Sequence, residues 1–125
     1  MLAIVIDDSR AMRGIIKRVL KGMGFDTLEA GDGQEALAVL AKSPRPDLAL
    51  VDWNMPNMNG FEFLKTIRAD NAFDDMKLTM VTTEIEMSQI ALALEAGANE
   101  YVMKPFTEEA MRDKISLMGF CQEAA

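Results

Sequence analysis

The chain has 125 residues, 50% of them hydrophobic and 26% charged, which is the balance of a soluble globular protein of one domain. Its formal net charge of −7 disfavours general binding to nucleic acid or anionic membranes, and favours cations and basic partner surfaces instead. The single cysteine, Cys121, excludes an intramolecular disulfide and the absence of histidine excludes a Cys–His catalytic pair, so we expect one cytoplasmic domain, residues 1–125.

The first apolar run, residues 2–6, predicts a buried strand that ends at Asp7 and Asp8. It is far too short to span a membrane and lacks the basic lead of a signal peptide, so neither membrane insertion nor export is expected. The following residues repeat apolar side chains at spacings of three and four, which predicts an amphipathic helix. Its apolar positions are Met12, Ile15, Ile16, Val19, Leu20 and Met23.

Two further pairs of strand and helix follow. Residues 25–30 alternate apolar and polar side chains, as a half-buried edge strand does, and an apolar helical stripe then covers residues 36–41 before two prolines end it. Residues 48–51 form a continuous apolar run that leads directly to Asp52. A loop rich in Asn, Pro and Gly, residues 54–60, then precedes the next helical stripe.

The last two pairs have the same pattern. Residues 78–81 predict a fourth strand, and the helical stripe that begins at Met87 ends before Gly97, which we expect to cap it. Residues 101–103 predict a fifth strand. Thr107 is expected to cap the last helix at its N-terminus, where two glutamates suit the positive end of the helix dipole.

Five such pairs predict an α/β fold, because parallel strands need crossover helices and both faces of the sheet must be covered. We expect a doubly wound, three-layer sandwich around a five-stranded parallel sheet, with its ligand site outside the carboxyl ends of the strands. The polar side chains that follow those ends are Asp7, Asp8, Asp52, Thr82, Thr83 and Lys104.

Three carboxylates at one sheet edge would repel by about 4 kcal/mol per pair at ~4 Å and an effective dielectric near 20, so a cation is needed there. Oxygen ligands without histidine favour Mg²⁺, or Mn²⁺, over zinc or copper. Lys104 adds a positive charge, and Thr82 and Thr83 add hydroxyl donors, which suits a phosphoryl group attacked by a carboxylate. Taken alone, Asp8 and Ser9 are better interpreted as a helix cap or turn former.

These residues stand in motifs that carry a family resemblance. The matching segments are residues 5–9, 50–56, 80–84, 97–98 and 101–106, together with Gly60. Over essentially its whole length the chain resembles response regulator receiver domains, particularly the stand-alone chemotaxis regulators of the CheY type. The resemblance implies a flavodoxin-like or CheY-like sandwich of five strands and five helices with strand order 2-1-3-4-5, an order that the apolar pattern does not establish.

The resemblance also implies roles in a metal site. Asp52 would be the phosphoacceptor, and Mg²⁺ would be the cofactor, with Mn²⁺ as a substitute. The implied metal ligands are Asp8, Asp52 and the backbone carbonyl of Asn54, with Asp7 in the acidic shell around the metal.

A switch is implied next to that site. Lys104 and Thr82 would contact phosphoryl oxygens, and the Lys104–Pro105 peptide bond would be cis. Thr82 would move toward the phosphoryl group and let the ring of Tyr101 turn inward, although a rim aromatic is the alternative for that tyrosine. Residues expected to tune the reaction are Thr83, Glu84 and Asn54. The expected output face is Ile85, Met87, Ile90, Tyr101 and Met103, with ordinary packing of helix on strand as the alternative.

The function implied is that of a response regulator in two-component signalling. A histidine kinase or histidine-phosphotransfer protein would supply the phosphoryl group, and a downstream protein such as a flagellar motor switch would read the changed face. We expect a monomer that signals by contact, with no output domain after the fifth helix. It would not be an enzyme, although self-phosphorylation from small acyl phosphates and autodephosphorylation are expected. The alternatives are a phosphorelay intermediate between histidine-containing proteins and a receiver-fold binding module.

Two other classes fit the residues less well. A haloacid dehalogenase-type phosphatase needs a second acid two residues after its nucleophile, and the segment 7–9 lacks that spacing. A flavodoxin-like cofactor binder needs a phosphate loop rich in Ser, Thr and Gly after the first strand, where this chain has acids.

Overall fold

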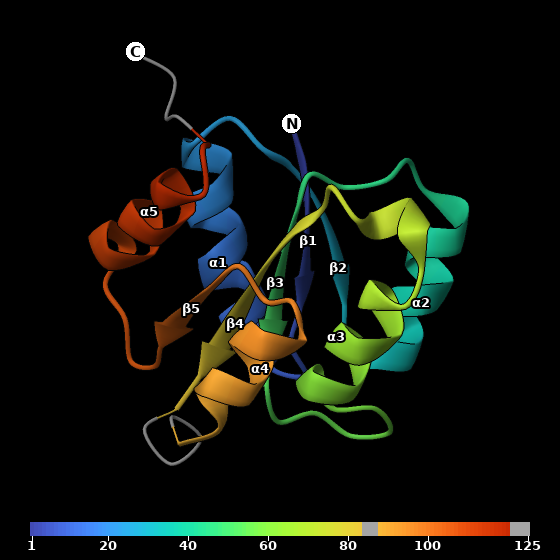
Figure 1. Ribbon diagram of the computed structural model, residues 1–125. Coiled ribbons are helices and arrows are strands. Elements are labelled where there is room, and N and C mark those ends of the chain that lie inside the picture. Colours follow the sequence, from blue (N-terminus) through green and yellow to red (C-terminus); the bar gives the residue numbers. More distant parts are fainter. Residues whose placement is uncertain (84–87, 121–125) are drawn as a thin grey trace.

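The computed structural model describes residues 1–83 and 88–120, which form a parallel sheet with helices on both faces (Figure 1). The strands are β1 (Leu2–Ile6), β2 (Asp26–Ala30), β3 (Leu48–Asp52), β4 (Lys77–Thr82) and β5 (Glu100–Met103). Their order in the sheet is β2-β1-β3-β4-β5, so the doubly wound fold and the strand order are both confirmed. Three residues with expected tuning or output roles lie outside the described residues: Glu84, Ile85 and Met87.

The helices divide between the two faces of the sheet (Figure 1). One face is covered by α1 (Arg10–Gly22) and α5 (Glu108–Leu117). The other face is covered by α2 (Gly33–Lys42), α3 (Gly60–Arg68) and α4 (Ile90–Ala96), with the short 3₁₀ helix η1 (Asn71–Phe73) after α3. No described helix is both long and apolar enough to cross a membrane.

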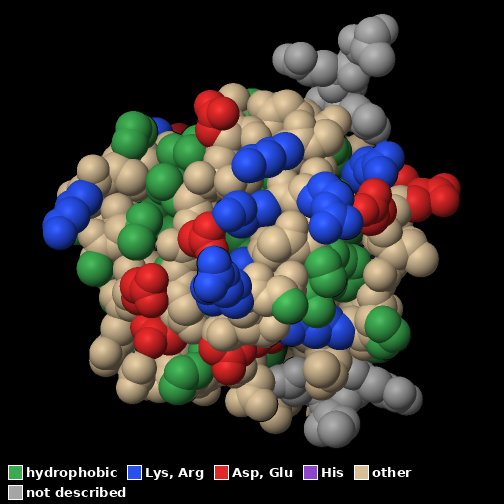
Figure 2. All heavy atoms as spheres, turned by 180° about the vertical axis from the view of Figure 1, so that it is seen from behind, with side chains coloured by type: hydrophobic (Ala, Val, Ile, Leu, Met, Phe, Trp, Pro, Cys, Tyr) green, Lys and Arg blue, Asp and Glu red, His purple; other side chains and the backbone are tan. Residues whose placement is uncertain are grey.

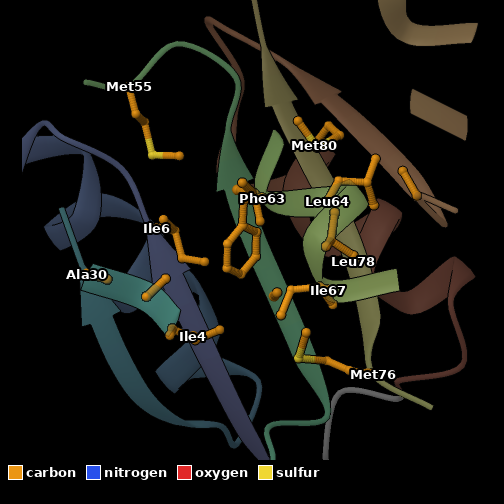
Figure 3. Close-up of a cluster of buried hydrophobic side chains, with 14 of the residues drawn as sticks. Ile4, Ile6, Ala30, Met55, Phe63, Leu64, Ile67, Met76, Leu78 and Met80 are labelled. Carbon is orange, nitrogen blue, oxygen red and sulfur yellow. The ribbon is translucent and has the colours of Figure 1, made fainter. Parts of the chain in front are cut away.

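Each strand of the sheet centre contributes to two hydrophobic cores, because neighbouring side chains point to opposite faces. Ile4 and Ile6 of β1 face the core under α2, α3 and α4, where Phe63 is fully buried (Figure 3). Ala3 and Val5 face the core under α1 and α5. All five residues of the central strand β3 are buried, which explains why that strand is a continuous apolar run rather than an alternating one.

The helix ends follow the predicted capping residues. The hydroxyl of Thr107 accepts a hydrogen bond from the backbone N–H of Ala110 at 3.0 Å, and Gly97 follows α4 with a φ of 120°. Ser9 caps α1 by accepting from the N–H of Met12 at 3.2 Å, so the interpretation of this serine as a helix cap is correct. These contacts are local, which is why the sequence predicts them.

The molecular surface carries both signs of charge despite the net negative total. Figure 2 shows Lys and Arg side chains grouped near the middle of one face, with acidic side chains among them. Helix α1 contributes five basic residues and no acidic ones: Arg10, Arg13, Lys17, Arg18 and Lys21. Positive charge is therefore concentrated on the helix that directly follows Asp7 and Asp8.

Gly60 lies where α3 comes close to the backbone at the end of β3. Its N–H donates to the carbonyl oxygen of Trp53 at 2.8 Å, and a Cβ at this position would lie 2.3 Å from the carbonyl oxygen of Asp52. A backbone atom cannot move aside as a flexible side chain can. Glycine is therefore required where α3 packs against the strand that ends in Asp52.

We expect Gly60→Ala to lower the free energy of unfolding by about 3 kcal/mol, because the added methyl group overlaps the backbone of Asp52. Urea denaturation measures the change. Gly14→Ala is the matched control, since Gly14 lies inside α1 and a Cβ added there would meet nothing within 4 Å. That control should raise the free energy of unfolding by about 0.5–1 kcal/mol. Equal effects of the two substitutions would contradict the close-approach argument.

Candidate functional site

The carboxyl ends of four strands bring the predicted polar side chains to one edge of the sheet. Asp7 follows β1, Asp52 ends β3, Thr82 ends β4 and Lys104 follows β5. The parallel register places Asp52 opposite Val81, one residue before Thr82. Because parallel strands all end at the same edge, residues separated by up to 97 positions become neighbours.

Lys104 joins two of the acids directly. Its ammonium lies 3.0 Å from Oδ1 of Asp52 and 3.2 Å from Oδ2 of Asp7. The backbone N–H of Lys104 donates to the carbonyl oxygen of Thr82 at 2.6 Å, which ties the lysine to the end of β4. The Lys104–Pro105 peptide bond is cis, as the family resemblance implied.

Burial and neighbouring charges shift the pKa values of Asp52 and Lys104. The pKa of Asp52 is raised to about 6, chiefly by burial and then by the nearby Asp7 carboxylate, against the opposing effect of Lys104. Burial alone would lower the pKa of Lys104, but the hydrogen bond and charge of Asp52, with the charge of Asp7, raise it overall. A carboxylate with a pKa well above its usual range needs a further positive charge to stay fully ionised.

The acid cluster fits a divalent cation. Ligand oxygens of Asp7, Asp8 and Asp52 lie within 4.8 Å of one another, and Asp7 and Asp52 are buried while Asp8 is exposed. Among the described residues, one ammonium, that of Lys104, contacts two of these three carboxylates, so negative charge is in excess. Every donor in the cluster is a hard oxygen. This donor set suits Mg²⁺ or Mn²⁺. Asn54 is exposed on the loop after β3, two residues from Asp52, so its metal role stays a prediction.

The threonines at the end of β4 differ in exposure. Thr82 is fully buried, and its hydroxyl donates to the carbonyl oxygen of Thr83 at 3.2 Å. Thr83 is half-buried. The Thr82 hydroxyl would have to leave this local bond in order to donate to a group on Asp52.

The described part of the expected output face lies on α4 and β5. Ile90 and Tyr101 are half-buried against the core under α2, α3 and α4, while Met103 is 44% exposed. The ammonium of Lys114 lies 4.4 Å from the centre of the Tyr101 ring, and it also pairs with Glu100 at 3.1 Å. A hollow between β5 and α5 is lined by residues that include Tyr101, Met103, Phe106 and Lys114.

Sequence reasoning assigned no site role to Arg13, yet this residue contacts the site. Its guanidinium Nη1 donates to the carbonyl oxygen of Asp7 at 2.7 Å. The contact joins a helix side chain to a backbone carbonyl across six residues. Helical spacing alone does not reveal it, because the backbone turn between β1 and α1 decides where the carbonyl of Asp7 points.

Comparison with known proteins agrees with this geometry. The family model of the response regulator receiver domain matches residues 3–116. The chain belongs to the response regulator receiver family. This receiver is 44% identical to a chemotaxis protein CheY homolog of Campylobacter jejuni over 116 residues, which covers 92% of this chain and 89% of the relative. It is 43% identical to the chemotaxis protein CheY of Pseudomonas aeruginosa, covering 92% of this chain and 93% of that protein.

Solved structures show the same fold. The chemotaxis protein CheY4 of Vibrio cholerae, crystallised at low pH, matches this receiver with a TM-score of 0.83 and 32% sequence identity, covering 95% of this chain and 97% of that one. A two-component response regulator with a GGDEF domain matches with a TM-score of 0.87 and 27% identity, covering 94% of this chain and 48% of that one. Receivers of this family are phosphoacceptor signalling switches rather than conventional enzymes, and they bind Mg²⁺ at an acidic pocket.

The raised pKa of Asp52 predicts that protons and Mg²⁺ compete. We expect the Mg²⁺ affinity to be constant above about pH 7 and to fall by up to about tenfold per pH unit below about pH 6, as Asp52 takes up a proton. Emission of Trp53, the single tryptophan and the neighbour of Asp52, can follow the titration. The chain has no histidine, so no other side chain has an ordinary pKa near 6.

The raised pKa of Asp52 also predicts how the free energy of unfolding depends on pH in the absence of metal. The folded protein holds the Asp52 proton more tightly than the unfolded chain does, because the folded pKa is about 6 against an ordinary 3.8. Asp52 therefore lowers the free energy of unfolding as the pH rises from about 4 to 6. Asp52→Asn should lack this slope. A parent protein whose Mg²⁺ affinity is unchanged from pH 5 to 8 would contradict the assignment.

Proposed function

We propose that this receiver accepts a phosphoryl group on Asp52 in a Mg²⁺-dependent reaction and signals by a change in its protein-binding face. A histidine kinase or histidine-phosphotransfer protein would be the donor. The observation that carries the proposal is the buried Asp52 carboxylate, held 3.0 Å from Lys104 and beside two further acids at the carboxyl edge of the sheet. Catalysis of phosphoryl transfer depends on this kind of positioned charge.

The residues of the site divide the work. One carboxylate oxygen of Asp52 attacks the phosphorus of the donor, and the bond from phosphorus to the donor nitrogen breaks. Lys104 stays within reach of Asp52 and stabilises charge on the phosphoryl oxygens. A cation held by Asp8, Asp52 and the carbonyl of Asn54, with Asp7 in its outer acidic shell, would neutralise the remaining negative charge.

We propose that Thr82 reports the reaction to the surface. Its hydroxyl would exchange the carbonyl of Thr83 for a phosphoryl oxygen, and the ring of Tyr101 would move into the space released. The cation–π contact with Lys114 gives Tyr101 a defined position before phosphorylation. Ring movement would then reshape the hollow between β5 and α5.

We propose a role in chemotaxis because the relatives cited above are named chemotaxis proteins. The output face would include Ile90, Tyr101 and Met103 of the described residues and, by prediction, Ile85 and Met87. Its target would be a downstream protein such as a flagellar motor switch. The protein would act as a cytoplasmic monomer, and it would catalyse its own phosphorylation from small acyl phosphates and its own dephosphorylation.

We expect incubation with acetyl phosphate and Mg²⁺ to add one phosphoryl group to Asp52, as an acid-stable and hydroxylamine-labile modification. Intact-mass spectrometry detects it. Asp52→Asn should lose the labelling, because an amide is not a nucleophile for this reaction. Asp75→Asn is the matched control, since Asp75 is exposed near the start of β4, at the opposite end of the sheet. Failure of the parent to be labelled by acetyl phosphate or by a kinase would favour a receiver-fold binding module.

The β-branched side chain of Thr83 is expected to narrow access to Asp52. We predict that Thr83→Ala reacts with acetyl phosphate roughly threefold faster than the parent, equivalent to about 0.6 kcal/mol of barrier. Thr83→Ser removes the methyl group and keeps the hydroxyl, so it separates the effect of the methyl group on the rate from that of the hydroxyl. Stopped-flow emission of Trp53 measures the rates. Equal rates for the parent and Thr83→Ala would reject the steric interpretation.

A further inference from the structure

Asp7 is held by hydrogen bonds at each of its polar atoms. Its N–H donates to the carbonyl oxygen of Ala30 at 3.1 Å, which continues the pairing of β1 with β2. Its Oδ1 accepts from the N–H of Ser9 at 2.8 Å, and its Oδ2 accepts from Lys104 at 3.2 Å. Its carbonyl oxygen accepts from Arg13 at 2.7 Å. Of these partners only Arg13 is a side chain of α1.

Arg13 ties the turn after β1 to the neighbouring strand β2. While Nη1 donates to the carbonyl of Asp7, Nε donates to Oε1 of Glu29 at 2.9 Å. The Arg13 side chain is only 17% exposed. A guanidinium can make both bonds at once because its donors are fixed in one plane, whereas a lysine ammonium is a single point charge.

Lys17 provides an internal comparison for this arrangement. It lies one turn further along α1 and forms an ion pair with the same glutamate, Glu29. Both hydrogen bonds lower the pKa of Glu29, and the bond from Lys17 has a larger effect than the bond from Arg13. Arg13 and Lys17 therefore carry the same charge and bind the same glutamate, but of the two only Arg13 contacts the backbone of the acid cluster.

We propose that Arg13 is a positioning residue for the metal site, because it fixes the backbone from which the Asp7 and Asp8 carboxylates project. This inference rests on the proposed function, since it concerns the cation of the same site. Outer partners that orient metal ligands commonly control metal affinity. The charge of Arg13 acts in the opposite sense, because a guanidinium close to the cluster repels a cation.

The position and the charge of Arg13 predict opposite effects on metal binding when this residue is replaced by a neutral one. If Arg13 acted only through its charge, its neutral replacement would strengthen metal binding. If Arg13 acts by holding the turn, neutral replacement weakens metal binding even though a repulsive charge has been removed. Lys17→Gln removes the same charge one helical turn away without touching the carbonyl of Asp7, so it isolates the effect of charge.

The test is calorimetric titration of Mg²⁺ into the full chain, with Mn²⁺ binding measured by electron paramagnetic resonance as a second readout. We expect Arg13→Gln to weaken binding by on the order of tenfold. Lys17→Gln should bind as the parent does or slightly more tightly. Arg13→Lys keeps the charge and loses the fixed pair of donors, so it should also weaken binding. Urea denaturation without metal checks that each variant is folded.

The outcomes are distinguishable. A parent that binds neither Mg²⁺ nor Mn²⁺ overturns the proposed function and this inference with it. A parent that binds metal, with Arg13→Gln binding equally or more tightly, overturns the inference alone. If Arg13→Gln does not fold, Arg13→Lys decides: weakened binding supports positioning, and unchanged binding rejects it.

Discussion

Three carboxylates beside one half-buried ammonium form the constraint on which the rest of this protein depends. Asp7 and Asp52 are almost completely buried. The single positive charge of Lys104 compensates only part of the negative charge of Asp7, Asp8 and Asp52. The folded state tolerates this excess because the sheet holds the acids at the ends of neighbouring strands. The crowded acids lower the stability of the folded protein, and they give the site a strong preference for a cation and for chemistry that uses a carboxylate nucleophile.

Several contacts around the acid cluster keep this arrangement in place. The missing side chain of Gly60 lets α3 approach the backbone of Asp52, and Arg13 holds the carbonyl of Asp7 from the other face of the sheet. The backbone bond from Lys104 to Thr82 links β5 with β4 at the same edge. Charges that are already oriented need little rearrangement during phosphoryl transfer, which is how a small domain can carry such a site.

The acid cluster and the proposed output face are connected through neighbouring residues of two strands. Thr82 ends β4 opposite Met103 of β5, and Tyr101 lies two residues earlier on that strand. Tyr101 sits on the edge strand, where its ring is half-buried and contacts Lys114 of α5. An aromatic ring at a sheet edge can change position without disrupting the central core. In the proposed switch, a change of charge at Asp52 would therefore reach the surface over a short distance.

Sequence alone determined the five strand and helix pairs, the capping roles of Thr107 and Gly97, and the set of polar residues at strand ends. These features depend on neighbours in the chain and on apolar periodicity. The strand order and the cis peptide came from family resemblance rather than from the pattern. Only the tertiary structure decided that Lys104 bridges Asp7 and Asp52, that the pKa of Asp52 rises to about 6, and that Arg13 contacts the carbonyl of Asp7. Burial and contacts between distant segments produce these properties, so no local pattern of residues encodes them.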